Sequence, residues 1–168
     1  FALGAFISIC SKYVLAIKGR HLWNPTNFGI SIMVLLAPHT MAVLSHQWSN
    51  SWAAVAIIYG IGFLVCWRAR VIHMSATYIL AYGAFALLRC GFDPARFPTE
   101  VAPLTGPMYS LFIFFMITDP RTVVAGRGAQ VFVSIVIALG DNLIRYLGVQ
   151  NIGWIQPFLP APPLFALF

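Results

Sequence analysis

Charged side chains are scarce in this chain of 168 residues, at 8% of the total. An ordinary soluble domain carries about 25% charged residues, because polar groups must cover its surface. The composition, with 60% hydrophobic residues, therefore argues against a soluble globular enzyme. It also argues against intrinsic disorder, which needs high charge and low hydrophobicity. The class that remains is an integral membrane protein.

Cysteine is rare as well and has no ligand spacing. The three cysteines, Cys10, Cys66 and Cys90, form no CxxC pair, so neither a metal centre nor a disulfide framework is predicted. The sequence also contains no Walker loop, no GxGxxG and no Ser–His–Asp order. We therefore expect no metal site and no catalytic centre of the kind that soluble enzymes carry.

Apolar runs occupy most of the chain. A membrane-spanning helix needs about 20 apolar residues, so about six spans fit. The runs cover residues 1–17, 28–44, 51–67, 71–88, 108–117 and 129–147. They predict an all-α fold, a polytopic transmembrane helical bundle that forms a single domain over 1–168. We interpret the proline-rich tail from Asn151 as a loop leading to a seventh span, and we expect the domain to be incomplete at one or both ends.

Basic residues lie between the apolar runs and favour alternate connections. The first, third and fifth connections carry Lys18 and Arg20, Arg68 and Arg70, and Arg121 and Arg127; the fourth carries Arg89 and Arg96, offset by Asp93 and Glu100. By the positive-inside rule the odd-numbered connections face the cytoplasm. The net charge of +6 is thus interpreted as a topology signal, and no nucleic-acid partner is expected.

The first of two notable motifs, at 18–29, reads KGRHLWNPTNFG. Asn24 is a preferred N-cap residue and Pro25 suits the first helical position, so a helix is predicted to begin here. Its free N–H groups and positive dipole end, with Arg20 upstream, favour an anion such as a phosphate or an ionised ring edge. The alternative is a plain interfacial loop at the start of a helix.

The second motif, at 114–122, reads FFMITDPRT and repeats the polar–proline pattern at Asp119 and Pro120. We interpret it as a second helix start after a run about half as long as a full crossing. Such a break points to a discontinuous helix at a substrate or ion site, where a charge is costly. The alternative is a helix end at which Asp119 pairs with Arg121 or Arg127. We predict that the two motifs meet in space, as the breaks of an inverted repeat would.

KGRHLWNPTNFG and FFMITDPRTVVAGRG together resemble the NqrB/RnfD family, the membrane subunits of the sodium-pumping NADH:quinone oxidoreductase and of the Rnf complex. The resemblance implies discontinuous helices in a urea-transporter-like inverted repeat, and flavin-based electron transfer coupled to ion movement. The family attaches its flavin through phosphate to a threonine in a Ser-Gly-Ala-Thr motif. Here the nearest match is Ser75-Ala76-Thr77, inside an apolar run. We therefore expect a short, divergent member without covalent flavin.

A cofactor-binding site for a non-covalent flavin or quinone is predicted at the two motifs. Basic groups would stabilise a reduced, anionic ring or a phosphate, and aromatic rings would stack on it. The predicted site residues are Arg20, Trp23, Asn24, Asn27, Asp119, Thr122 and Arg127.

Three functions remain open. The chain is interpreted first as an integral membrane subunit linked to electron transport, an enzyme at most as a subunit of an oxidoreductase complex. The alternatives are a non-catalytic accessory subunit of a larger membrane complex and a small-solute or ion transporter subunit. In each case the expected partners are membrane lipids and other integral membrane subunits. The expected location is the bacterial inner membrane, with the motif loops on the cytoplasmic side.

Three further features within the apolar runs have simple structural interpretations. The small residues Ala56 and Gly60, with Gly62 beside them, predict close helix packing. Asp141 and Arg145, four residues apart on one helix, predict an interfacial ion pair, with a relay role for Asp141 as the alternative. His39 is interpreted as bonding a carbonyl freed by Pro38, or as a contact for a haem, pigment or quinone.

Overall fold

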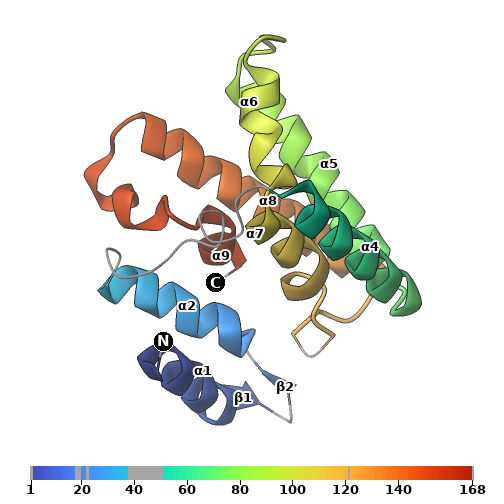
Figure 1. The fold of residues 1–168 in the computed structure, drawn as a ribbon. Coiled ribbons are helices and arrows are strands. Elements are labelled where there is room, and N and C mark those ends of the chain that lie inside the picture. The colour runs from blue at the N-terminus through green and yellow to red at the C-terminus, as the bar shows by residue number, and fades with distance from the viewer. Residues whose placement is uncertain (1, 18–19, 22, 38–50, 121, 168) are drawn as a thin grey trace.

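The computed structural model describes residues 2–17, 20–21, 23–37, 51–120 and 122–167 (Figure 1). The helical elements in these ranges are α1 (Ala2–Val14), α2 (Pro25–Leu36), α4 (Trp52–Arg68), α5 (Ile72–Arg89), α6 (Phe97–Val101), η2 (Ala102–Thr105), α7 (Pro107–Leu111), η3 (Phe112–Met116), α8 (Arg127–Val149), η4 (Gly153–Phe158) and α9 (Pro162–Leu167). Two-residue strands β1 (Ala16–Ile17) and β2 (Arg20–His21) form an antiparallel hairpin in which Ala16 pairs with His21. Apart from this hairpin, the regular secondary structure of the described chain is helical, as its composition predicts.

The helices form two groups that meet at α9. Helix α5 packs along α8, and α4 packs against α7 and η3. Helix α1 packs against α2, and this pair is drawn in blue in Figure 1. The short α9 contacts both α8 and α2, so it links the N-terminal pair to the rest of the molecule.

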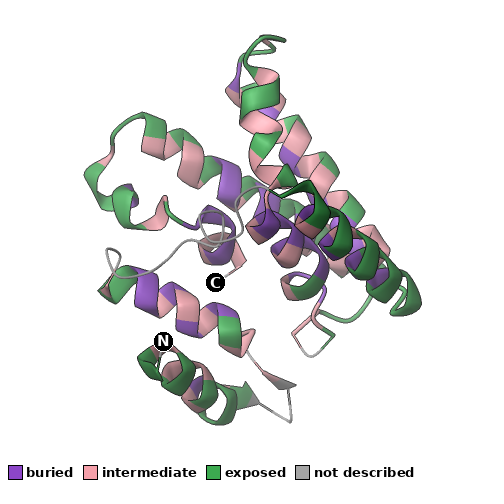
Figure 2. Ribbon diagram, viewed as in Figure 1, coloured by how far each residue is buried: buried purple, intermediate pink, exposed green. Residues whose placement is uncertain are grey.

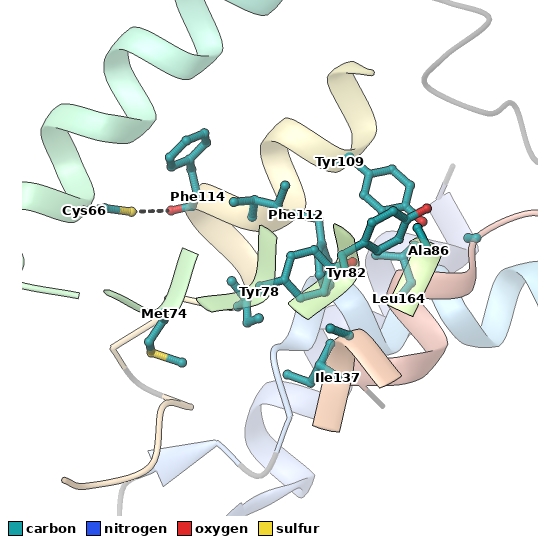
Figure 3. Close-up of a cluster of buried hydrophobic side chains, with 14 residues drawn as sticks. Cys66, Met74, Tyr78, Tyr82, Ala86, Tyr109, Phe112, Phe114, Ile137 and Leu164 are labelled. Atoms are coloured by element: carbon teal, nitrogen blue, oxygen red, sulfur yellow. Dashed lines mark hydrogen bonds between the residues drawn. The ribbon is translucent and has the colours of Figure 1, made fainter. Parts of the chain in front are cut away.

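The core lies where α5, α7, η3 and α8 meet (Figures 2 and 3). Tyr78 and Tyr82 of α5 and Phe112 of η3 are fully buried. The rings of Tyr78 and Phe112 pack edge to face, with centroids 5.4 Å apart, a favourable geometry for aromatic pairs. Five aromatic side chains belong to this core, and three of them, Tyr78, Tyr82 and Tyr109, carry a hydroxyl that must be hydrogen-bonded.

Five of the six expected helices occupy their apolar runs to within a few residues, but α2 ends early. It stops at Leu36, and Ala37 has φ −145° and ψ 60°. A residue before a proline avoids the helical region because the proline ring would clash with it, and Pro38 follows Ala37. The rest of the expected run, including His39, lies outside the described residues.

Few of the described helices are long enough for a full membrane crossing. In the described part of the chain, α8, with 23 residues, is the one helix that is both long and apolar enough to cross a membrane. The apolar helices α1, α2 and α4 have 13, 12 and 17 residues, fewer than the ~20 that a perpendicular crossing needs. The tail forms η4 and the six-residue α9. Apolar runs therefore mark where the helices lie, but most of these helices are shorter than a full perpendicular crossing.

Close packing on α4 uses a different glycine from the predicted pair. Gly62 is buried, and a Cβ atom there would lie 2.5 Å from Cγ of Phe114 in η3. Gly60 has no heavy atom within 4 Å of such a Cβ, and Ala56 is exposed. The contact between α4 and η3 therefore depends on Gly62, while Ala56 and Gly60 lie on the opposite, open face.

Candidate functional site

Asn24 is the N-cap of α2, as predicted. Its backbone is extended, with φ −60° and ψ 118°, and Pro25 follows at the first helical position. The Oδ1 atom of Asn24 accepts hydrogen bonds from the backbone N–H groups of Thr26 and Asn27, at 3.0 and 3.2 Å. Two of the orphan donors at the helix start are satisfied in this way, which leaves the side-chain amide of Asn24 able to bond elsewhere.

That amide joins the two motifs. Nδ2 of Asn24 donates to Oδ2 of Asp119 over 3.1 Å, across 95 residues of chain. The contact is partly buried, and Asp119 lies just after the end of the α7–η3 helix. The prediction that Asn24–Pro25 and Asp119–Pro120 meet in space is therefore confirmed.

Asp119 does not start a helix, so this part of the prediction was wrong. Its backbone carbonyl accepts from the N–H groups of Thr122 and Val123, at 3.1 and 3.0 Å, which closes a single turn. The next helix, α8, begins at Arg127 after Gly126, which has φ +90°. A positive φ redirects the chain at that glycine, and the Asp119 carboxylate bonds across the molecule where a local cap was expected.

Two cavities flank the Asn24–Asp119 bond. The first is an apolar groove of about 350 Å³. It has Trp23, Asn24 and Thr122 among its lining residues, and otherwise mainly apolar side chains of α5, α8, α9 and the segment 117–124. The second is a more open, polar depression of about 350 Å³. Its lining residues are Ser8, Ile9, Lys12, His21, Asn24, Pro25, Thr26 and Asp119. Asn24 lines both cavities.

Four of the predicted site residues gather here. Trp23, Asn24 and Thr122 line the apolar groove, and Asp119 lines the polar depression. The Thr122 hydroxyl donates to the Asp119 carbonyl at 3.3 Å. Trp23 stacks on Phe28 of α2, with ring centroids 6.0 Å apart and planes inclined by 26°. These contacts hold both motif segments against the cavities.

The other three predicted residues behave differently. Asn27 is fully buried, and its Nδ2 donates to the carbonyl of Leu164 in α9 at 3.0 Å. It therefore faces the seam between α2 and α9, away from both cavities. Arg127 is exposed at the start of α8, and neither cavity has it among its lining residues. Arg20 lies in β2, and its side chain is outside the described part of the structure.

A buried polar cluster around Asp141 was largely missed. The predicted pair between Asp141 and Arg145 forms, with Arg145 Nε 3.1 Å from Asp141 Oδ1. Asp141, however, is fully buried, and it also accepts from the hydroxyls of Tyr78 and Tyr109, at 2.7 and 2.8 Å. Arg145 bonds the Tyr109 hydroxyl in addition. The expected interfacial pair is therefore a buried network, because two tyrosines from other helices share its carboxylate.

The π-helical turn η3 places the end of α7 next to α4 and α5. The N–H of Ile117 bonds the carbonyl of Phe112 at 3.0 Å, five residues back. Side chains of other helices bond the widened turn: Ser75 donates to the Ile113 carbonyl at 2.9 Å, and the Cys66 thiol donates to the Phe114 carbonyl at 3.3 Å (Figure 3). Such turns are frequent at functional sites, and here the turn ends shortly before Thr118 and Asp119. Local sequence carries no clear signal for it.

The nearest match to a flavin-attachment motif lies on a helix. Ser75, Ala76 and Thr77 lie within α5. Ser75 is buried, and its hydroxyl is engaged by Ile113. Thr77, the residue that would carry the phosphate, is half-buried, and Ala76 beside it is exposed. The near match therefore lies within a regular helix.

The chain is similar to a subunit of the ion-translocating oxidoreductase complex of Alcanivorax borkumensis, with 27% identity over 123 residues. The similarity covers 71% of this chain and 35% of that protein. The chain thus spans about a third of the length of the curated relative that it matches. No family model and no solved structure matches the chain. The relative is named as part of a multi-subunit oxidoreductase, in line with the resemblance that the two motifs carry.

Proposed function

We propose that the chain is an integral membrane subunit of an electron-transport complex and that the groove beside Asn24 binds a non-covalent flavin or quinone. The similarity to a component of an ion-translocating oxidoreductase complex supports the first part. The hydrogen bond between Asn24 and Asp119 carries the second, because it joins two motifs distant in sequence at the edge of an apolar groove.

Exposed apolar side chains support the membrane setting. On α4 they include Trp52, Ile57, Ile61 and Leu64, exposed by 54–81%; on α8 they include Phe132, Leu139 and Leu143, exposed by 48–67%. Soluble monomers rarely leave large contiguous apolar patches open. In our proposal these faces contact lipid or neighbouring subunits, and the short helices form a polytopic bundle with discontinuous spans. The membrane is the bacterial inner membrane, with both motif loops on its cytoplasmic side.

The groove has the chemistry that a flat redox ring needs. Binding pockets of ~300–1,000 Å³ are usually apolar, with a few polar groups that orient the ligand. Trp23 is an aromatic lining residue suited to stacking, and Asn24 and Thr122 are the polar lining residues that offer hydrogen bonds. A bound flavin or quinone would supply the electron-accepting ring. In this proposal Asp119 holds Asn24 in place, and Arg20 and Arg127 of the two motifs would supply positive charge.

A structural accessory role is the second candidate, favoured by the open face of α4. Ala53, Ala56 and Gly60 are exposed there at helical spacing, and nothing lies within 4 Å of a Cβ built on Gly60. Small residues of this kind allow a partner helix to approach closely in a membrane. This observation is compatible with a subunit that packs against others and binds no redox group.

The two candidates are separated by the cofactor content of the protein. The chain is extracted from membranes in mild detergent, and its absorption spectrum is recorded before and after reduction. Denaturation then releases any non-covalent flavin, and solvent extraction recovers any quinone. A redox group that co-purifies with the chain in a fixed ratio supports the electron-transport role. Stable co-purifying subunits without any redox group would favour the accessory role.

A further inference from the structure

The net charge of the chain is confined to three short stretches. Residues 12–20, 68–70 and 119–127 contain seven of the ten basic residues and one of the four acidic residues. The surplus of six in these stretches equals the net charge of +6 of the whole chain. Every other charged residue is therefore balanced by one of opposite sign elsewhere.

The balancing pairs are visible in the fold. Arg145 pairs with the buried Asp141 on α8. Arg89, at the end of α5, forms an ion pair with Glu100 of α6. Arg96 lies between Arg89 and Glu100 in the sequence, three residues after Asp93. The end of the molecule formed by the α5–α6 connection is thus neutral as a whole.

The described cations of the three stretches lie at one end of the fold, which we call the cationic end and define by Lys12, Arg68, Arg70 and Arg127. Lys12 and Asp119 line the same depression. His73, just after the second stretch, bonds Gln130 of α8 at 2.7 Å, next to the third stretch. In Figure 1 the hairpin, the α4–α5 connection and the segment before α8 all lie in the lower part of the view, away from α6.

The described cations at this end are open to solvent. Lys12, Arg68, Arg70 and Arg127 are all exposed. Their one acidic neighbour in these stretches, Asp119, already accepts a hydrogen bond from Asn24. The cationic end therefore presents a surplus of positive charge on long side chains, next to the apolar faces of α4 and α8.

We propose that the cationic end is a binding surface for anionic phospholipid headgroups. A leaflet that contains anionic lipid places negative phosphates directly above hydrocarbon, and the protein presents cations directly next to exposed apolar helix faces. Each Lys or Arg near such a surface contributes about fivefold in affinity, the equivalent of about 1 kcal/mol. The proposal rests on the membrane setting of the proposed function and adds the lipid class and the residues that bind it. An acidic protein surface is the competing partner.

The test compares matched arginines at the two ends. The wild-type chain and the variants Arg68→Gln, Arg68→Gln/Arg70→Gln and Arg96→Gln are reconstituted into nanodiscs of phosphatidylcholine alone or with phosphatidylglycerol. Thermal stability in the two compositions is measured at low and high salt, and phospholipid retained after detergent extraction is counted by native mass spectrometry. Neither Arg68 nor Arg70 belongs to the candidate cofactor site.

We expect phosphatidylglycerol to raise the thermal stability of the wild type and to be retained preferentially over phosphatidylcholine. The double variant loses at least fivefold in that preference, Arg96→Gln leaves it unchanged, and high salt reduces it.

Equal loss in Arg68→Gln and Arg96→Gln, or no preference in the wild type, would overturn the proposal. If the wild type shows no lipid preference but still incorporates into nanodiscs of both compositions, only the lipid proposal fails and the membrane setting stands. A chain that carbonate washes from membranes would overturn both proposals. Binding to an acidic soluble protein with no lipid preference would favour the competing partner.

Discussion

Asn24 and Asp119 hold the start of α2 and the end of the α7–η3 helix together through one hydrogen bond of 3.1 Å. The same asparagine caps α2 through its other side-chain atom. A single side chain therefore provides both the local helix cap and the contact between two distant motifs. For this reason the two polar–proline motifs form parts of one site.

The Asp119 carboxylate is expected to matter for stability even without a cofactor. Asp119→Ala removes the acceptor of the Asn24 amide, and hydrogen bonds to charged groups contribute about 1.5–3 kcal/mol. Asp119→Asn retains an acceptor oxygen and should cost less. Unfolding of the detergent-solubilised protein, followed by circular dichroism, measures both.

A double-mutant cycle isolates the contact between the two motifs. Asn24→Ser keeps a capping oxygen but cannot reach across to Asp119, so its cost and that of Asp119→Ala should be less than additive. Thr26→Ala, at an exposed position on the same turn, is the matched control and should be close to neutral. Strictly additive costs would mean that the hydrogen bond contributes nothing.

Glycines 60 and 62 on α4 are expected to respond in opposite ways to alanine. The new methyl group of Gly62→Ala would overlap the Phe114 side chain, and overpacking of this kind costs about 1–3 kcal/mol. Gly60→Ala meets open space and should stabilise the helix by about 0.5–1 kcal/mol. Thermal unfolding of the isolated chain compares the two.

The Gly60 variant also bears on the accessory role. If another helix packs on the open face of α4, Gly60→Ala should weaken the co-purification of partner subunits while the isolated chain remains stable. Unchanged partner retention would argue against a tight helix contact at this position. A stable Gly62→Ala protein would contradict the close approach of α4 to η3.

The buried network around Asp141 is expected to act as a unit. Tyr78→Phe and Tyr109→Phe each remove one donor to this carboxylate, at an expected cost of about 1.5–3 kcal/mol. Asp141→Ala leaves Arg145 without its partner and should cost about 3–5 kcal/mol. Tyr146→Phe, at an exposed tyrosine on the same helix, is the control. Equal effects of Tyr146→Phe and Tyr109→Phe would show that the network does not stabilise the fold.

Much of the helical framework could be predicted because local start and stop residues set the helix ends. Asn24 and Pro25 start α2, and Pro38 ends it, each through short-range sterics and hydrogen bonding. The length of a span is harder to predict from apolar residues alone, since a turn can end a helix inside an apolar run. Asp119 and Pro120 show the limit of local patterns. They repeat the polar–proline pattern that starts α2, but here it forms only a single turn, and the next helix begins after Gly126.

The site was predictable where its chemistry is local and unpredictable where packing decides it. Asn24 and Asp119 stood out because polar groups beside proline are unusual in apolar sequence. Tyr78 and Tyr109 gave no such signal, since tyrosine is common in apolar helices and their shared partner, Asp141, is distant in sequence. Asn27 belongs to the first motif, but the rotation of α2 turns it toward α9. The π-helical turn arises from contacts with α4 and α5.

Both motif segments are expected to be reached from the same side of the membrane. Cysteines introduced as Arg20→Cys and Arg127→Cys, in a Cys10→Ser background, should both react with an impermeant maleimide added from the cytoplasmic side. Arg96→Cys, on the α5–α6 connection, should react from the other side. Labelling of residues 20 and 127 from opposite sides would contradict the predicted topology.

The amount of flavin or quinone bound per chain, compared between matched tryptophan variants, tests the proposed function most directly. Trp23 lines the apolar groove, whereas Trp154 lies exposed in η4 and is the control. We predict that the wild type and Trp154→Ala carry the same redox group, that Trp23→Ala loses most of it, and that denaturation releases it from an unmodified polypeptide. A chain purified intact from its membrane without flavin or quinone would contradict the account, as would equal retention by Trp23→Ala or a flavin nucleotide bonded to a threonine.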